Sequence, residues 1–158
     1  AAPRWTVAGV AAVLAVAAVA VALSYLADRE RRTAAEEWRA DPPAALDRLR
    51  RADDLDPFAP GPALTAGLIE IQRGRPAAAR RWLGDAIERD RGNWFLWLAR
   101  GLAASEAGDR PAAVADYRRA VELDPRGPLA RAALRRARAG RPLSAAEIFE
   151  RIRREAAD

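Results

Sequence analysis

The chain lacks several residue types on which catalysis and metal binding depend. Its 158 residues include no Cys, no His and no Met, and all 27 basic residues are Arg because the sequence contains no Lys. The absence of Cys excludes disulfides and thiolate metal ligands. The absence of His excludes a Ser-His-Asp triad and the commonest metal ligand, and the absence of Lys excludes a P-loop. We therefore expect no catalytic residue, no metal and no cofactor in this segment.

A cluster of acids, Asp53, Asp54 and Asp56, is the remaining candidate for a cation site. A hard cation needs six or more oxygen ligands in a defined loop. These acids instead lie where a helix is expected to end before Pro57. We interpret them as side chains that solvate a turn.

Residues 5–26 form a long run without a charge. The run reads WTVAGVAAVLAVAAVAVALSYL and lies between Arg4 and Asp28. As a helix it would be about 33 Å long, enough to cross a hydrocarbon core of about 30 Å. Trp5 and Tyr25 stand near its ends, where amphipathic rings prefer the membrane interface. We expect a transmembrane helix here. The alternatives are a cleaved signal peptide, whose apolar region is shorter, and a buried helix, which is unusual in so small a domain.

The residues in and around this run give expectations about its membrane. Small residues four apart, such as Ala11 and Ala15, would let it pack with other transmembrane helices, although the abundance of Ala explains the same pattern. Arg29, Arg31 and Arg32 follow the run, and the positive-inside rule then favours a cytoplasmic side for the rest of the chain. We expect localisation in a bacterial cell membrane, with the run in the bilayer.

The rest of the chain repeats at an interval of 34 residues. Residues 52–57, 86–91 and 120–125 read ADDLDP, AIERDR and AVELDP. Residues of the same kind keep this register in three sets: Ala45, Ala79 and Ala113; Leu49, Leu83 and Tyr117; and Asp56, Asp90 and Asp124. Small and large residues at this spacing share one face of a helix. Each unit should therefore be a hairpin of two helices that stacks on its neighbours.

The turns between the expected helices carry their own signals. Gly74 and Gly108 should end the first helix of two units, because Gly tolerates the left-handed cap conformation. Pro76 and Pro111 should open the second helix, where a missing N–H is harmless. Asp109 is the expected N-cap of that helix in the last full unit.

The repeat resembles the tetratricopeptide repeat, whose pattern over 34 residues is Trp, Leu-Gly, an aromatic residue, Ala, an aromatic residue, Ala and Pro. Unit 94–127 departs from this pattern at Arg100 and Ala104 and matches it at Trp97, Gly101, Ala113, Tyr117, Ala120 and Pro125. Unit 60–93 keeps Gly67, Ala79, Leu83 and Ala86, and unit 26–59 keeps only its second-helix half. The resemblance implies an all-α protein in which the transmembrane helix is followed by an α-solenoid of about three hairpins over residues 27–127.

Residues 128–158 are interpreted as a degenerate repeat whose two helices cap the solenoid. One helix is expected over 128–139, followed by a turn that begins at Gly140. Ser144 and Glu147 form a capping box for a last helix that extends to about Ala157. Terminal repeats are expected to differ in this way and to have a polar outer face.

The resemblance also implies that a partner binds the face formed by the first helix of each unit. The family's peptide-contacting positions correspond here to Leu64, Leu68, Ile71 and Gln72 in one unit and to Phe95, Leu98, Leu102, Ser105 and Glu106 in the next. Most are apolar, which suits an amphipathic or apolar segment of a protein or peptide partner. The alternative is that the apolar residues pack into the core, and the sequence leaves both open. The Lys/Asn clamp that some members use to grip a C-terminal carboxylate is absent.

A basic patch follows the repeats and contains no acid. It consists of Arg131, Arg135, Arg136 and Arg138. Such a patch could meet anionic lipid headgroups, but we favour its interpretation as the solvated surface of the cap. Nucleic acid is not an expected partner, because no aromatic side chains interleave the arginines.

Two functional hypotheses follow. The first is a membrane-anchored protein–protein interaction module or scaffold that contacts the bilayer through residues 5–26. The second hypothesis rests on another resemblance. The last apolar helix is followed by the stretch RRADDLDPFAPGP and by a repeat that opens with NW. This succession resembles the C-terminal tail of bacterial O-antigen ligase-like membrane glycosyltransferases, which act on lipid-linked glycans. The catalytic part would then lie outside this chain. The absence of Met leads us to expect that the sequence is a piece that has lost its own N-terminus.

Overall fold

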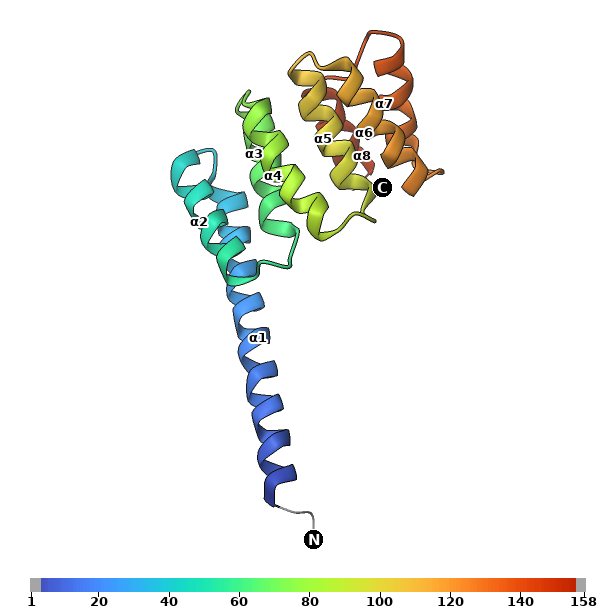
Figure 1. Ribbon diagram of the computed structural model, residues 1–158. Helices are drawn as coiled ribbons and strands as arrows, with labels where there is room; N and C mark the ends of the chain where they lie inside the picture. The colour runs from blue at the N-terminus through green and yellow to red at the C-terminus, as the bar shows by residue number, and fades with distance from the viewer. Residues whose placement is uncertain (1–3, 156–158) are drawn as a thin grey trace. The chain divides into compact units, whose positions relative to one another are not determined.

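The computed structural model describes the backbone of residues 4–155 and the side chains of residues 13–154. This part of the chain forms eight α-helices and no strand, which confirms the all-α class (Figure 1). The contacts between helices divide the chain into two units, residues 1–57 and residues 58–158. We call them unit 1 and unit 2 and describe each by itself.

Unit 1 is a hairpin of one long and one short helix. Helix α1, Arg4–Glu37, continues without a break from the apolar run into the charged region. Helix α2, Pro42–Leu55, begins at the N-cap Asp41, whose carboxylate accepts a hydrogen bond from the Ala44 N–H at 3.1 Å. The Arg48 guanidinium pairs with Glu30 at 3.3 Å and joins the two helices.

The structure does not support the expected transmembrane helix over residues 5–26. Within the part of the chain that it describes, no helix is both long and apolar enough to cross a bilayer. The uncharged stretch with described side chains is residues 13–27. Residues 5–12 of the expected span lie outside the residues whose side chains are described.

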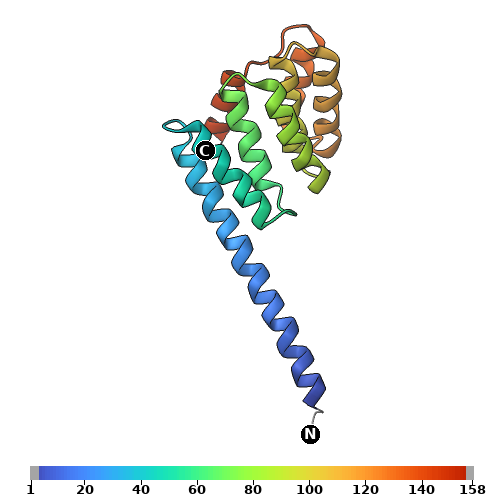
Figure 2. The same cartoon turned by 60° about the vertical axis from the view of Figure 1, so that its left-hand side comes forward.

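Unit 2 contains six helices that follow one another in hairpins (Figures 1 and 2). They are α3, Gly61–Gln72; α4, Pro76–Arg89; α5, Trp94–Glu106; α6, Arg110–Leu123; α7, Pro128–Arg138; and α8, Ala145–Glu155. The close helix pairs run from α3 through α4, α5 and α6 to α7. Helix α8 is attached differently, as described below.

The hairpins α3–α4 and α5–α6 of unit 2 are each closed by a glycine on the first helix and a large side chain on the second. A Cβ atom added to Gly67 would lie 2.5 Å from Cγ of Leu83, and one added to Gly101 would lie 2.7 Å from two ring carbons of Tyr117. The helices therefore approach closely only because these two positions carry no side chain. This pairing explains why both residues keep the 34-residue register.

The ends of the helices also repeat. Gly74 and Gly108 have φ angles of 68° and 75°, which confirms the expected left-handed caps. Asp90 and Asp124 end the second helices with closely similar dihedral angles, φ −141° and ψ 80° against φ −129° and ψ 82°. Asp109 accepts a hydrogen bond from the Ala112 N–H at 3.1 Å and is the expected N-cap.

Most of the core of unit 2 is one apolar cluster that runs through several of its helices. Its large members include Leu83, Leu98, Leu102 and Tyr117, with many alanines between them. The aromatic residues Trp94, Phe95 and Trp97 are half-buried and pack against this core.

Candidate functional site

The predicted partner-binding positions of α3 lie on a face that is only partly open. Leu64 and Leu68 are half-buried and pack against the core of unit 2, and Ile71 is a buried member of it. Gln72, at the end of the helix, is exposed. The spacing of these residues does place them on one side of α3, but most of that side already has neighbours.

The corresponding positions of α5 are even less accessible. Leu98 and Leu102 are each 1% exposed, and Phe95 is half-buried. The Ser105 hydroxyl lies 3.1 Å from the Tyr117 hydroxyl, so that it serves the contact between α5 and α6. Glu106 is exposed.

The helix that covers this face is α8. Ile148 is 2% exposed and belongs to the same apolar cluster as Leu98 and Leu102, and Phe149 and Ile152 pack against that cluster. The Glu106 carboxylate accepts a hydrogen bond at 2.8 Å from the N–H of Ala145, the first residue of α8. In Figure 1 this helix is partly hidden behind α5 and α6.

The sequence left open whether the apolar residues of this set line a groove or pack into the core, and in this conformation several of them are buried. Ile71, Leu98 and Leu102 are buried core residues in this conformation and belong to the same apolar cluster as Ile148 of α8. Gln72 and Glu106 are accessible. A role in partner binding for the predicted set stays a prediction.

Sequence reasoning missed the buried apolar residues of α8 and of the segment that precedes it. Leu143, Ile148, Phe149 and Ile152 are absent from the predicted site, although Leu143 and Ile148 are among the most buried side chains of unit 2. The available signal was the spacing of Ile148, Phe149 and Ile152, which places three apolar residues on one side of an otherwise charged helix. The capping box that starts this helix was expected and is confirmed, since the Ser144 N–H donates to the Glu147 carboxylate at 2.9 Å.

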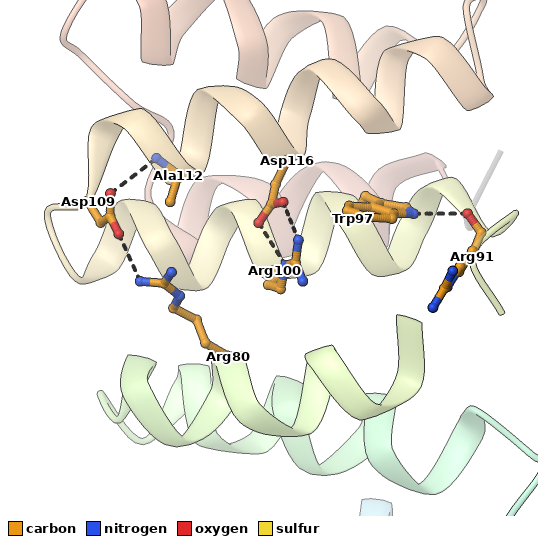
Figure 3. Close-up of polar contacts among 7 residues, drawn as sticks. All are labelled: Arg80, Arg91, Trp97, Arg100, Asp109, Ala112 and Asp116. Carbon is orange, nitrogen blue, oxygen red and sulfur yellow. Dashed lines mark hydrogen bonds and ion pairs between the residues drawn. The ribbon is translucent and has the colours of Figure 1, made fainter. Parts of the chain in front are cut away.

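Polar contacts tie the hairpins together away from this face (Figure 3). Arg100 donates two hydrogen bonds to the Asp116 carboxylate, at 2.9 Å and 2.6 Å, and its guanidinium lies 4.8 Å from the centre of the Trp97 ring. Arg80 of α4 donates to Asp109 at 2.9 Å and so links two successive hairpins. The Ala112 N–H and the Arg80 guanidinium hold the pKa of Asp109 below its usual value.

Tyr117 is the one residue of unit 2 with a strongly shifted pKa. Its side chain is fully buried between α5 and α6, and this burial raises the pKa of Tyr117 to about 12, although the hydrogen bond with Ser105 acts in the opposite direction. The phenol is therefore neutral near pH 7 and serves packing.

The predicted basic patch lies on the exposed side of α7 and beside it. Arg131, Arg135, Arg136 and Arg138 are all exposed. Arg131 donates to the Arg126 carbonyl at 3.0 Å, and Arg136 donates to the Arg141 carbonyl at 2.8 Å. Two of the four side chains therefore contact the loops at the ends of α7, which agrees with a structural role in the cap.

The described part of the chain contains no group of three or more acidic side chains placed to hold a metal ion. Asp53, Asp54 and Asp56 of the predicted turn lie at the end of α2 and are not gathered around a common point.

Solved structures with the same architecture identify the fold. The first TPR domain of RPAP3 (Spaghetti), bound to an HSP90 peptide, has a TM-score of 0.68 and 21% identity, over 74% of this chain and 94% of that chain. The TPR domain of Arabidopsis OM64 has a TM-score of 0.66 and 19% identity, over 74% and 98%. The fold is that of a tetratricopeptide repeat domain. PcrH in complex with the chaperone-binding region of PopD shares it with a TM-score of 0.59 and 16% identity, over 78% and 91%.

The TPR fold is seen from structure and not from sequence comparison. No family model matches the chain, and no curated protein matches it. The low identities to the solved structures mean that the likeness shows the fold alone.

Proposed function

We propose that this chain is a protein–protein interaction module that binds an amphipathic or apolar segment of a partner on the first-helix face of α3 and α5. The observation that carries the proposal is the apolar character of that face, where Leu64 and Leu68 are half-buried beside Leu98 and Leu102. Apolar side chains along one row of helices suit a helical segment that inserts its own apolar side.

The structural neighbours support this class of function. One of them was solved with an HSP90 peptide bound and another with the chaperone-binding region of PopD. Both were solved in complex with a segment of another protein. We expect no enzymatic activity from the residues of this segment.

A photo-cross-linking experiment tests this proposal. A photoreactive residue at Gln72, which is exposed at the end of α3, should cross-link to a partner protein in an extract of the source cells. The same residue at Arg118, which is exposed on the second helix α6, should not give that product. A synthetic peptide of the cross-linked partner segment should then bind the full chain and lose at least tenfold in affinity after Leu68→Glu. Cross-linking of equal yield at both positions would contradict the proposal.

Attachment of residues 5–26 to a membrane is a second proposal, with localisation at a bacterial cell membrane. It is supported by the exposure of large apolar side chains on the described part of this stretch, of which Val16 is 71% and Val21 is 70% exposed. Apolar side chains in such a row attract lipid or another apolar surface. The full chain should float with lipid vesicles in a density gradient, and a chain with Val16→Asp and Val21→Asp should float less. Equal flotation of the two chains would count against it.

The likeness to the tail of O-antigen ligase-like proteins is a further proposal, supported only by sequence motifs. No residue of the described part carries glycosyl-transfer chemistry that could test it. The gene sequence upstream of Ala1 decides it, because a ligase-like protein requires many additional apolar spans there.

A further inference from the structure

Helix α8 has the residue pattern of a peptide that binds a groove, and it packs against the core of unit 2. Its apolar residues Ile148, Phe149 and Ile152 face the core of unit 2, whereas Glu150 and Arg153 of the same helix are exposed. A helix with one apolar side and one charged side is the form in which a helical peptide binds a groove.

The attachment of α8 differs from that of the other helices of unit 2. From α3 to α7, each helix packs closely against the next one along the chain, whereas α8 forms no such close pair. Its polar links to the rest of the unit include the hydrogen bond from the Ala145 N–H to Glu106 at 2.8 Å and the ion pair of Glu147 with Arg136 at 3.8 Å. A turn that begins at Gly140, with a φ angle of 72°, separates it from α7. Side chains, not close backbone packing, therefore hold it.

The helical structure of α8 depends on its contacts with the rest of unit 2. The helix has 11 residues, and helices shorter than about 12–15 residues are marginal in isolation. When α8 leaves the face, its helical structure is expected to be lost, and the apolar face beneath it becomes available.

Glu106 gives the face a preferred direction for a bound helix. The first N–H groups of a helix have no partner within the helix, and they carry partial positive charge. Glu106 provides a carboxylate for one of these groups in α8. Another helix bound in the same direction would meet the same carboxylate with its own N-terminus.

We infer that α8 is the resident ligand of the first-helix face, and that the external partner is an amphipathic helix that replaces it. This inference rests on the proposed function. The partner helix carries apolar residues at the spacing of Ile148, Phe149 and Ile152 and places its N-terminus at Glu106. Because Leu98 and Leu102 are already fully covered, the face holds one such helix at a time, and α8 lowers the affinity for the partner.

A fluorescent peptide with the sequence of residues 142–155 is the probe for this inference. It is titrated against three versions of the full chain: the unchanged sequence, Ile148→Glu and Ala146→Glu. Both substitutions add one carboxylate to α8, but Ile148 is buried and Ala146 is exposed. The peptide should bind the Ile148→Glu chain at least tenfold more tightly than the other two. Equal affinity for all three chains, or no binding to any of them, would overturn the inference.

Hydrogen exchange measured on the same chains makes every outcome informative. In the Ile148→Glu chain the amides of α8 should lose protection while those of α5 and α6 keep it. Loss of protection throughout α3–α7 would mean that α8 is an integral part of the core, and the inference would be wrong. The cross-linking test at Gln72 does not depend on this result, since a partner can bind the face without resembling α8.

Discussion

The hairpins α3–α4 and α5–α6 share one backbone plan but use different side chains to hold it. In α5–α6 the glycine meets the ring of Tyr117, and Asn93 and Asp109 cap both helices with side-chain hydrogen bonds. In α3–α4 the glycine meets Leu83, and neither helix has a side-chain cap.

The comparison shows what this repeat requires. A glycine opposite a large side chain and a glycine turn are present in both hairpins, and the helix ends have nearly the same dihedral angles in both. Side-chain caps on both helices and an aromatic ring opposite the glycine are present only in α5–α6. The small-against-large contact therefore sets the geometry, while the remaining consensus residues add stability to a hairpin that forms without them.

The two hairpins also differ in how they accommodate a buried acidic side chain. Arg100 and Asp116 pair with two hydrogen bonds between α5 and α6. In α3, Glu70 is buried, and one of its carboxylate oxygens is without a hydrogen-bond partner in the described part of the chain. The hairpin α3–α4, which resembles the family pattern less closely, thus contains the carboxylate with fewer hydrogen-bond partners.

The largest effect should come from filling the glycine contact. Gly101→Ala should destabilise the chain by about 3 kcal/mol, because overpacking forces a rigid ring to move. Gly67→Ala should have a smaller effect, because the Leu83 side chain can change rotamer. Chemical denaturation of both variants measures the difference. Equal losses would show that the two contacts are equivalent.

The next effect should come from separating the ion pair of the second hairpin. Arg100→Leu should destabilise the chain by about 2 kcal/mol, because it leaves the carboxylate of Asp116 unpaired at 7% exposure. The double variant Arg100→Leu and Asp116→Ala should recover part of this loss. A double variant that is less stable than the sum of the two single changes would argue against the pair as the cause.

Alkaline pH should destabilise the hairpin α5–α6 through Tyr117, a residue that the hairpin α3–α4 lacks. Its pKa is raised to about 12 in the folded chain, against about 10 in the unfolded chain. The folded state then holds the phenol proton more tightly, so that this stability is complete below pH 10 and is lost as the pH rises toward 12. The loss should be about 1.4 kcal/mol per pH unit in that window. Tyr117→Phe should remove this loss, as measured by urea denaturation at pH 9, 10 and 11. An unchanged pH dependence in the variant would assign the loss to other groups.

The smallest effect should come from the cap that only the second hairpin has on its first helix. Asn93 accepts a hydrogen bond from the Phe95 N–H at 3.1 Å. Asn93→Ala should lower the stability by about 1 kcal/mol, whereas Asn93→Asp keeps an acceptor oxygen and should lower it little. Thermal denaturation distinguishes the two. Similar losses in both variants would mean that the amide has another role.

Local features of this fold were predictable from the sequence. The caps at Gly74 and Gly108, the N-cap Asp109 and the capping box at Ser144 depend on residues within a few positions of one another. Such signals can be read without knowing the tertiary structure. The repeat register likewise predicted that Leu83 and Tyr117 occupy equivalent positions, because the interval itself is visible in the sequence.

The candidate site could not be predicted in the same way. Leu98 and Leu102 have the helical spacing expected either of a groove or of a core, and only the element packed on them decides which. That element is α8, and the contact of Glu106 with Ala145 joins residues 39 positions apart. Arg100 was recognised as a departure from the family pattern, but its partner Asp116 could not be identified, because it lies on another helix.

The most direct test is whether α8 covers the first-helix face in solution. The chain has no cysteine, so Glu106→Cys and Ala145→Cys introduce the only two thiols, which a short bismaleimide can join. The cross-link should form rapidly within one chain and should be largely lost when Ile148→Glu is added, because the apolar contacts of α8 hold these positions together. Failure to form an intramolecular cross-link, or an equal yield with Ile148→Glu, would contradict the placement of α8 on this face.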